Sequence, residues 1–139
     1  MDRLNAQFYC AAQLSRDDIS AAKAAGVDLI VCNRPDNEDP GQPSAEQVEQ
    51  WSREAGIPFA WLPVVPGQIT PQTVGEFAKL TAGHQHILAY CRTGTRSATL
   101  WAAAEVAARR LTPQQAAEAV ANTGRSVGPA IALLEALNA

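Results

Sequence analysis

The sequence lacks a long hydrophobic run, a basic cluster and a cysteine framework, and each absence excludes a class of protein. No apolar stretch reaches the length of about 18 residues that a membrane-spanning helix needs. Lys and Arg number 11 against 14 Asp and Glu, so the net charge is −3, and no Lys/Arg run supplies the basic face of a nucleic-acid-binding protein. The three cysteines Cys10, Cys32 and Cys91 have no framework spacing, which argues against a disulfide scaffold and against a zinc site.

What the sequence does contain is the balance of a globular protein. Hydrophobic residues make up 47% of the 139 residues and charged residues 18%. No repeat or low-complexity linker divides the chain, so we expect one domain over residues 1–139. The N-terminus lacks the layout of a signal peptide, which predicts a cytoplasmic protein. We expect no cofactor, no bound metal, no nucleic-acid partner and no membrane contact; the sequence does not determine the oligomeric state.

Short apolar runs alternate with helical segments along the chain. Capping residues or Thr-Pro pairs open most of the helices, and apolar runs bounded by turn residues indicate buried strands. The alternation predicts an α/β fold with three αβα layers around a mainly parallel central sheet. The predicted strands cover residues 27–32, 57–62 and 87–90, with a short strand at 7–11 at the sheet edge, and the predicted helices cover residues 15–26, 44–56, 70–83 and 97–110, followed by helices that begin near 112 and 128.

Three loops are expected to meet where a parallel sheet binds its ligands, outside the carboxyl ends of the strands. They cover residues 33–43, 63–69 and 91–96. The third loop has the sequence Cys-Arg-Thr-Gly-Thr-Arg, followed by Ser97 at the start of the next helix. This segment is the strongest candidate for a functional site.

The composition of the Cys91 loop predicts an anion site that contains its own nucleophile. Amides at the start of a helix have no intrahelical partner, and together with the helix dipole they attract negative charge. Cysteines in such positions have pKa values of roughly 3.5–7.5, against about 8.5 when free, so Cys91 is predicted to be a thiolate nucleophile. Arg96 can offer a two-donor fork to an oxyanion, and Ser97 can donate a hydrogen bond to the sulfur. The remaining predicted substrate- or anion-binding residues are Arg92, Thr93, Gly94 and Thr95 of this loop, with Arg34 and Asp36 from the loop 33–43.

An inert buried cysteine at a strand end is the alternative interpretation of Cys91, and we adopt that interpretation for Cys32. It does not account for the glycine, two arginines and two threonines that follow Cys91 within five positions. Arg34 follows Cys32 closely and can either reach the site or pair with Asp36 or Asp39.

The segment Cys91 to Ser97 resembles the active loop of cysteine-dependent phosphatases, written Cys-x5-Arg-Ser/Thr, with one residue fewer. The chain as a whole is similar to the bacterial phosphatase-like domain of beta-lactamase-hydrolase-like proteins, which are relatives of the dual-specificity phosphatases. This resemblance implies a cysteine-phosphatase-like fold and hydrolysis of a phosphomonoester. By resemblance, Cys91 forms a phosphocysteine, Arg96 holds the phosphoryl oxygens and Ser97 assists release of the thiolate. The similar segments are residues 13–15, 33–36, 63–66, 91–97 and 111–113.

The chain departs from the phosphatase pattern at the general acid. Dual-specificity phosphatases supply an aspartate from the loop after the second strand, whereas residues 63–68 here read Pro-Val-Val-Pro-Gly-Gln. Asp36, Glu38 or Asp39 can replace it from the preceding loop, or they can serve only turn formation and solvation. A proton donor contributes about 10²–10⁴-fold, so its absence predicts a slow phosphatase or a different reaction. Tyr90 also stands before the cysteine where the larger family often has histidine.

Sulfur transfer is the second hypothesis for the same loop. Rhodaneses have a shorter active loop, and Cys-Arg-x-Gly-x-Arg-Ser closely resembles it. A persulfide on Cys91 needs no general acid, but the Gly-His-Ile-Pro-Gly-Ala-type segment that rhodaneses usually show is absent. The expected partner is therefore a small anionic substrate, either a phosphomonoester or a sulfur donor.

Other residues receive simpler interpretations. Trp51 and Trp61 lie inside predicted elements and are predicted core residues with partnered N–H groups. His84 and His86 flank a strand start and are predicted surface residues. Gln42 and Gln68 lie in loops near the predicted site and are candidates for substrate contact.

Overall fold

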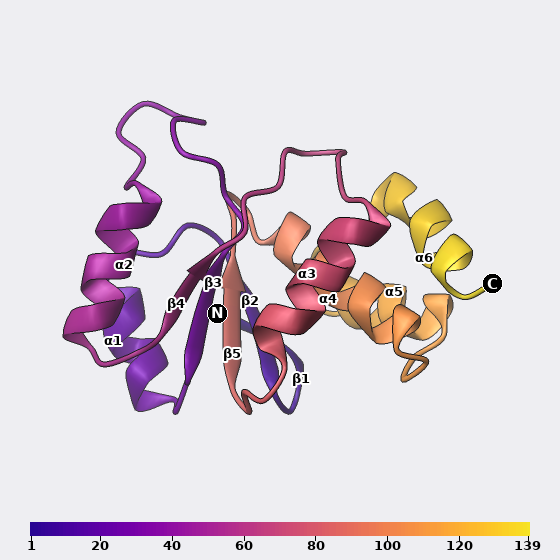
Figure 1. Ribbon diagram of the computed structural model, residues 1–139, viewed down its shortest axis with the longest axis horizontal. Coiled ribbons are helices and arrows are strands. Elements are labelled where there is room, and N and C mark those ends of the chain that lie inside the picture. The colour runs from indigo at the N-terminus through magenta and orange to yellow at the C-terminus, as the bar shows by residue number, and fades with distance from the viewer.

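The computed structural model describes residues 1–139 as five strands, six α-helices and one 3₁₀ turn (Figure 1). The strands are β1 (Asp2–Asn5), β2 (Phe8–Ala11), β3 (Leu29–Cys32), β4 (Phe59–Trp61) and β5 (Ile87–Tyr90). The helices are α1 (Arg16–Ala24), α2 (Ala45–Glu54), α3 (Pro71–Thr81), α4 (Thr95–Ala107), α5 (Pro113–Ala121) and α6 (Ile131–Leu137), with the 3₁₀ turn η1 (Gly128–Ala130) before α6.

The strands form one sheet in the order β1-β2-β5-β3-β4. All neighbours pair in parallel except β1, which runs antiparallel to β2. Helices α1 and α2 lie on one side of the sheet and α3 to α6 on the other (Figure 1). This architecture confirms the predicted α/β class, its three layers and its mainly parallel sheet.

Side-chain alternation along the strands builds a core on each face of the sheet. In β5, Ile87 and Ala89 join the core under α3 to α6, whereas Leu88 and Tyr90 join the core under α1 and α2. All four residues of β5 are buried because the strand is central and covered on both faces. Cys91, which directly follows the carboxyl end of this strand, is therefore held in a fixed position.

The predicted helix starts are confirmed at their caps. The side chains of Ser15, Ser44, Thr70 and Thr112 each accept a hydrogen bond from the third following backbone N–H. Helix α4 begins at Thr95, two residues earlier than the sequence predicted, because Gly94 takes the cap position in the left-handed region.

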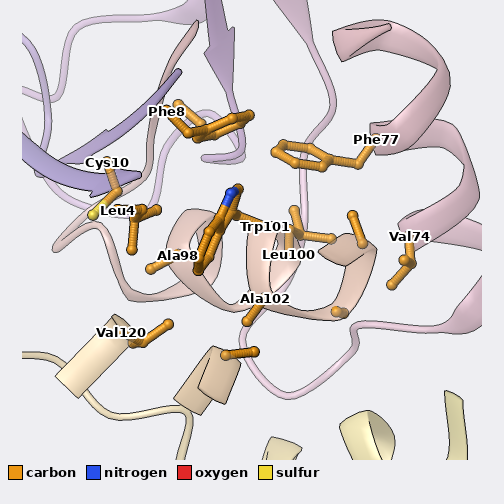
Figure 2. Close-up of a cluster of buried hydrophobic side chains, with 14 of the residues drawn as sticks. Leu4, Phe8, Cys10, Val74, Phe77, Ala98, Leu100, Trp101, Ala102 and Val120 are labelled. Carbon is orange, nitrogen blue, oxygen red and sulfur yellow. The ribbon is translucent and has the colours of Figure 1, made fainter. Parts of the chain in front are cut away.

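Helix α4 is the central helix of its layer. Nine of its residues are buried, and it contacts α3, α5, α6, β2 and β5. Trp101 on this helix is 2% exposed and packs near Phe8 and Phe77, whose ring centroids are 5.6 Å apart (Figure 2). The helix that follows the Cys91 loop is thus anchored by the largest core of the molecule.

Two predictions were wrong in their placement. Residues 8–11 form an interior strand, because the polar segment Asp2–Asn5 adds β1 outside it. Only Leu4 of β1 is buried, so the apolar signal for that strand is weak. Trp61 is 48% exposed because β4 is the opposite edge strand, although its N–H does donate to the Arg34 carbonyl at 3.0 Å. No helix has the length and hydrophobicity that would let it cross a membrane.

Candidate active site

Cys91 lies at the carboxyl end of β5, at the entrance to α4. Its side chain is fully buried, and its backbone N–H donates to the Ala11 carbonyl at 3.3 Å. The Gly94 N–H points back at the Cys91 Sγ, with 3.1 Å between nitrogen and sulfur. A backbone donor at this distance stabilises negative charge on the sulfur. The predicted convergence of helix-start amides on Cys91 therefore has one direct contact in the structure.

Arg125 links the Cys91 loop to the N-terminal strand β1. Its Nε donates to the Thr93 carbonyl at 3.0 Å, and its Nη1 pairs with the Asp2 carboxylate at 3.0 Å. A Cβ on Gly94 would lie only 2.6–2.9 Å from the Arg125 guanidinium, and Gly94 has a φ of +92°. The positive φ favours glycine at this position, and any side chain here would also have to displace the Arg125 guanidinium.

Glu38 fixes the position of the Arg96 side chain. The two form a bidentate pair, with Nη1 to Oε2 at 2.8 Å and Nη2 to Oε1 at 2.9 Å, and Nη1 also donates to the Val64 carbonyl at 2.8 Å. Three of the five guanidinium donors are thus used. The Nε–H and one Nη2–H stay available, and they lie on the same edge of the planar group. Arg96 is therefore fixed in place while a two-donor fork for an oxyanion is left free.

Arg96 and Glu38 shift each other's pKa values. Burial opposes the charge on Arg96, but Glu38 and the nearby Cys91 sulfur favour it, and the pKa of Arg96 is raised overall. The hydrogen bond from Arg96, together with the charge of Arg34, holds the pKa of Glu38 below its usual range. Glu38 is consequently a carboxylate at neutral pH and cannot donate a proton in this arrangement.

Arg34 uses its donors within the 33–44 loop. Its Nε donates to Glu38 at 3.0 Å, its Nη2 to Asp39 at 2.7 Å and its Nη1 to the Gln13 side chain at 3.0 Å. The Arg34 side chain is only 4% exposed. This residue was predicted to bind the anion, and the structure instead places it beneath Glu38, with each guanidinium nitrogen paired inside the protein.

Two other residues of the same loop also have structural partners. The Asp36 carboxylate, predicted to contact the anion, accepts the Ala45 N–H at the start of α2 at 2.8 Å. Gln42 accepts from the Glu38 N–H at 3.0 Å and donates to the Pro35 carbonyl at 2.9 Å. Both residues therefore fix the loop that carries Glu38.

Ser97 is fully buried next to the loop, and its hydroxyl donates to Asn33 Oδ1 at 2.8 Å. Asn33 in turn donates to the Leu62 carbonyl at 2.9 Å, which fixes the orientation of its amide. The Ser97 proton is directed at Asn33 and not at the sulfur, in contrast to the hydrogen bond expected from the sequence. This contact joins the start of α4 to the end of β3.

The outer rim of the loop faces a pocket of about 520 Å³. Arg92, Thr93, Thr95 and Arg96 line one side of it. The Arg92 Nε pairs with Asp39 at 2.9 Å, and the hydroxyls of Thr93 and Thr95 lie 3.1 Å apart. The structure thus brings the predicted residues 91–97 together, with Arg96 turned inward and a concavity beside the loop.

Cys32 differs from Cys91 in its surroundings. Burial raises the pKa of Cys32 to about 11, and its thiol donates to the Arg34 carbonyl at 3.4 Å. It is therefore a neutral thiol at pH 7, as expected for a structural cysteine.

Sequence reasoning missed Arg125, Asp2 and Asn33 as parts of the site. Arg125 meets Thr93 across 32 positions of sequence and Asp2 across 123. The sequence shows a glycine at position 94, but it does not show which group packs against that glycine.

Comparisons with known proteins identify the family of this chain. The chain is 32% identical over 104 residues, 74% of its length, to a beta-lactamase hydrolase-like protein of Agrobacterium fabrum, and the match covers 24% of that protein. A beta-lactamase hydrolase-like protein of Xylella fastidiosa is 28% identical over 134 residues, 95% of this chain. That match covers 31% of the Xylella fastidiosa protein. The chain therefore spans about a quarter to a third of the length of these relatives.

Solved structures give the same fold. A Neisseria meningitidis Z2491 protein with a provisional phosphatase assignment matches with a TM-score of 0.87 and 30% identity, over 97% of this chain and 96% of its own. PTPMT1 has the same fold, with a TM-score of 0.74 at 19% identity over 98% of this chain and 92% of its own. The sequence model of the phosphatase-like domain of beta-lactamase hydrolase-like protein matches residues 1–108. The chain belongs to that phosphatase-like family.

Proposed function

We propose that this protein hydrolyses phosphomonoesters through a phosphocysteine on Cys91. The observation that supports this most directly is the Arg96 guanidinium, which is fixed by Glu38 and Val64 yet keeps two donors free close to the Cys91 sulfur. Two phosphoryl oxygens match such a fork. Arg96 would then stabilise the charge that spreads over the equatorial oxygens during transfer.

The reaction proceeds in two steps. The Cys91 thiolate attacks phosphorus, the S–P bond forms, and the P–O bond breaks with its electron pair going to the leaving alkoxide or phenoxide. Water then attacks the phosphocysteine, releasing inorganic phosphate and regenerating the thiolate. The Gly94 N–H, 3.1 Å from the sulfur, stabilises the thiolate as it departs.

The proton for the leaving group has no protein donor in this arrangement. Glu38 is ionised and shared between two arginines, and Asp39 accepts from Arg34 and Arg92. The leaving oxygen must take its proton from water. We therefore expect slow turnover that rises steeply as the leaving group becomes more acidic.

A cytoplasmic location and organisation as one domain over residues 1–139 are also part of the proposal.

Sulfur transfer is the second candidate, favoured by the complete burial of the Cys91 side chain within a loop one residue shorter than the phosphatase pattern. In that reaction the thiolate attacks the outer sulfur of thiosulfate, a persulfide forms and sulfite leaves. Cyanide then takes the sulfur as thiocyanate. A single terminal sulfur needs less room than a phosphoryl group, and the reaction needs no general acid.

Paired assays on wild type and Cys91→Ser distinguish the two functions. Hydrolysis of an aryl phosphate that vanadate inhibits and Cys91→Ser abolishes supports the phosphatase. Thiocyanate production from thiosulfate, lost in the same variant, supports sulfur transfer. Absence of both activities in wild type, with the thermal unfolding of the two proteins unchanged, would leave an anion-binding module and overturn both proposals.

A further inference from the structure

The pocket beside the Cys91 loop has two chemically different sides. Its loop side carries two arginines and three threonines, whereas its far side carries no charged residue and no carboxylate enters the lining anywhere. The loop-side residues are Arg92, Thr93, Thr95, Arg96 and Thr99, and the far side consists of Pro66, Gly67, Ile69, Val127, Pro129, Ala130 and Leu133.

The far wall comes mostly from the segment 127–133, which covers η1 and the first residues of α6. Arg125, two residues before this wall, donates to the Thr93 carbonyl in the Cys91 loop. Val127 and Leu133 also pack against the core beneath α4. The wall is therefore fixed relative to the anion-binding loop. It lies outside residues 1–108, over which the family model matches, although a curated relative and a solved structure align over 95% and 97% of the chain.

We propose that this wall is a specificity subsite for an uncharged, apolar leaving group on the phosphomonoester substrate. The inference rests on the proposed phosphatase function and names its substrate class. The phosphoryl end would lie on the Cys91 loop, where the free donors of Arg96 are, and the body of the leaving group would lie against Val127, Pro129 and Leu133. Sugar phosphates and polyol phosphates would leave their hydroxyls unpartnered against this wall.

The size of the pocket fits this class of substrate. A volume of about 520 Å³ lies inside the range of roughly 300–1,000 Å³ that is typical of small-molecule sites. It exceeds what a phosphoryl group alone would fill. Fused or extended ring systems would use the apolar wall more fully than a single ring.

The test compares three substrates on three proteins. The substrates are glycerol phosphate, phenyl phosphate and 2-naphthyl phosphate, of which the last two have leaving groups of similar acidity. The proteins are wild type, Leu133→Ser and the control Leu137→Ser. Leu137 lies one turn further along α6 and also packs against the core, but it does not line this pocket.

We expect wild type to prefer 2-naphthyl over phenyl phosphate in kcat/KM. Leu133→Ser should lower kcat/KM for 2-naphthyl phosphate by roughly tenfold or more and should lower kcat/KM for phenyl phosphate by less, while an unchanged thermal unfolding transition shows that the variant is folded. Val127→Ser, added as a fourth protein, should give the same selective loss. Leu137→Ser should leave the ratio between the two aryl substrates unchanged.

Equal kcat/KM for the two aryl phosphates, or equal losses in Leu133→Ser and Leu137→Ser, would overturn the subsite while leaving the phosphatase intact. Turnover of none of the three substrates by wild type would overturn the phosphatase itself and the subsite with it. If glycerol phosphate is the preferred substrate, the apolar class is wrong.

Discussion

Two loops at the carboxyl ends of the strands differ sharply in what they bring to the site. The loop 33–44, between β3 and α2, carries the carboxylates, and those of Glu38 and Asp39 are paired with arginines. The loop 62–70, between β4 and α3, contains no charged residue. It contributes the Val64 carbonyl to Arg96 and Pro66, Gly67 and Ile69 to the pocket. Both loops lie at the same end of the sheet (Figure 1).

This contrast explains how a site that resembles a phosphatase can lack its usual acid. The loop where the resemblance predicts an aspartate is apolar and faces the pocket. Glu38 of the other loop does not replace it as a proton donor, because its arginine partners keep it ionised. One loop therefore orients Arg96, and the other shapes the space in front of it.

Replacing the arginine that contacts both loops should have the largest effect. Arg96→Lys retains a positive charge but loses the planar fork, so kcat/KM for an aryl phosphate should fall by about 10²–10³-fold. Arg110→Lys is the matched control, since Arg110 forms its own bidentate pair with Glu105 on the surface. A loss below threefold in Arg96→Lys would contradict the role given to the fork.

Removing the carboxylate from the charged loop should have the second largest effect. Glu38→Gln leaves Arg96 and Arg34 without their shared anion, and misplacement of the fork should lower kcat by roughly 10- to 100-fold. If Glu38 were instead the proton donor, the variant would show its loss mainly on substrates with poor leaving groups. Comparing phenyl phosphate with 4-nitrophenyl phosphate separates the two, because our account predicts similar losses on both.

The apolar loop should respond in a different way. Ile69→Ala removes part of the pocket lining, so we expect a loss of less than about tenfold in kcat/KM for 2-naphthyl phosphate and little change for phenyl phosphate. The matching measurement on Glu38→Gln should show equal losses on both substrates. If the two variants gave the same pattern, the division of roles between the loops would be wrong.

Acid unfolding offers the smallest expected effect. The pKa of Glu38 is lowered in the folded protein, mainly by Arg96, so its ionic contacts contribute stability above the unfolded value of about 4.3. That contribution is lost as the pH falls below this value and through the lower folded pKa. Urea unfolding of wild type and Glu38→Gln should give free energies that converge from pH 6 to pH 3. A gap that stays constant or widens would show that Glu38 is not held as an ionised partner.

Much of the fold could be predicted because its signals are local. Caps such as Ser15 and Thr112 act on amides three residues away, and the burial of β5 follows from four consecutive apolar residues. The edge strand β1 escaped prediction because only one of its residues is buried.

The residues of the Cys91 loop could be predicted from the sequence, but the residues from other loops that hold them in place could not. Residues 91–97 are contiguous, so their chemistry can be read from the sequence. Glu38 meets Arg96 across 58 positions and Ser97 meets Asn33 across 64. Such pairs depend on the order of strands in the sheet, which placed the β3 loop beside the β5 loop through direct pairing of these strands. The sequence left three candidate acids in the 33–44 loop, and only the fold assigns Glu38 and Asp39 to arginines and Asp36 to a helix start.

The most direct test of the account is to trap the covalent intermediate. Wild-type protein mixed with an aryl phosphate and quenched in acid within the first turnover should yield, by mass spectrometry, a peptide with one phosphoryl group on Cys91. The adduct should be absent from Cys91→Ser and should not appear on Cys10 or Cys32. An added sulfur atom on Cys91 after incubation with thiosulfate, with no phosphoryl adduct from any aryl phosphate that is turned over, would contradict the phosphocysteine mechanism.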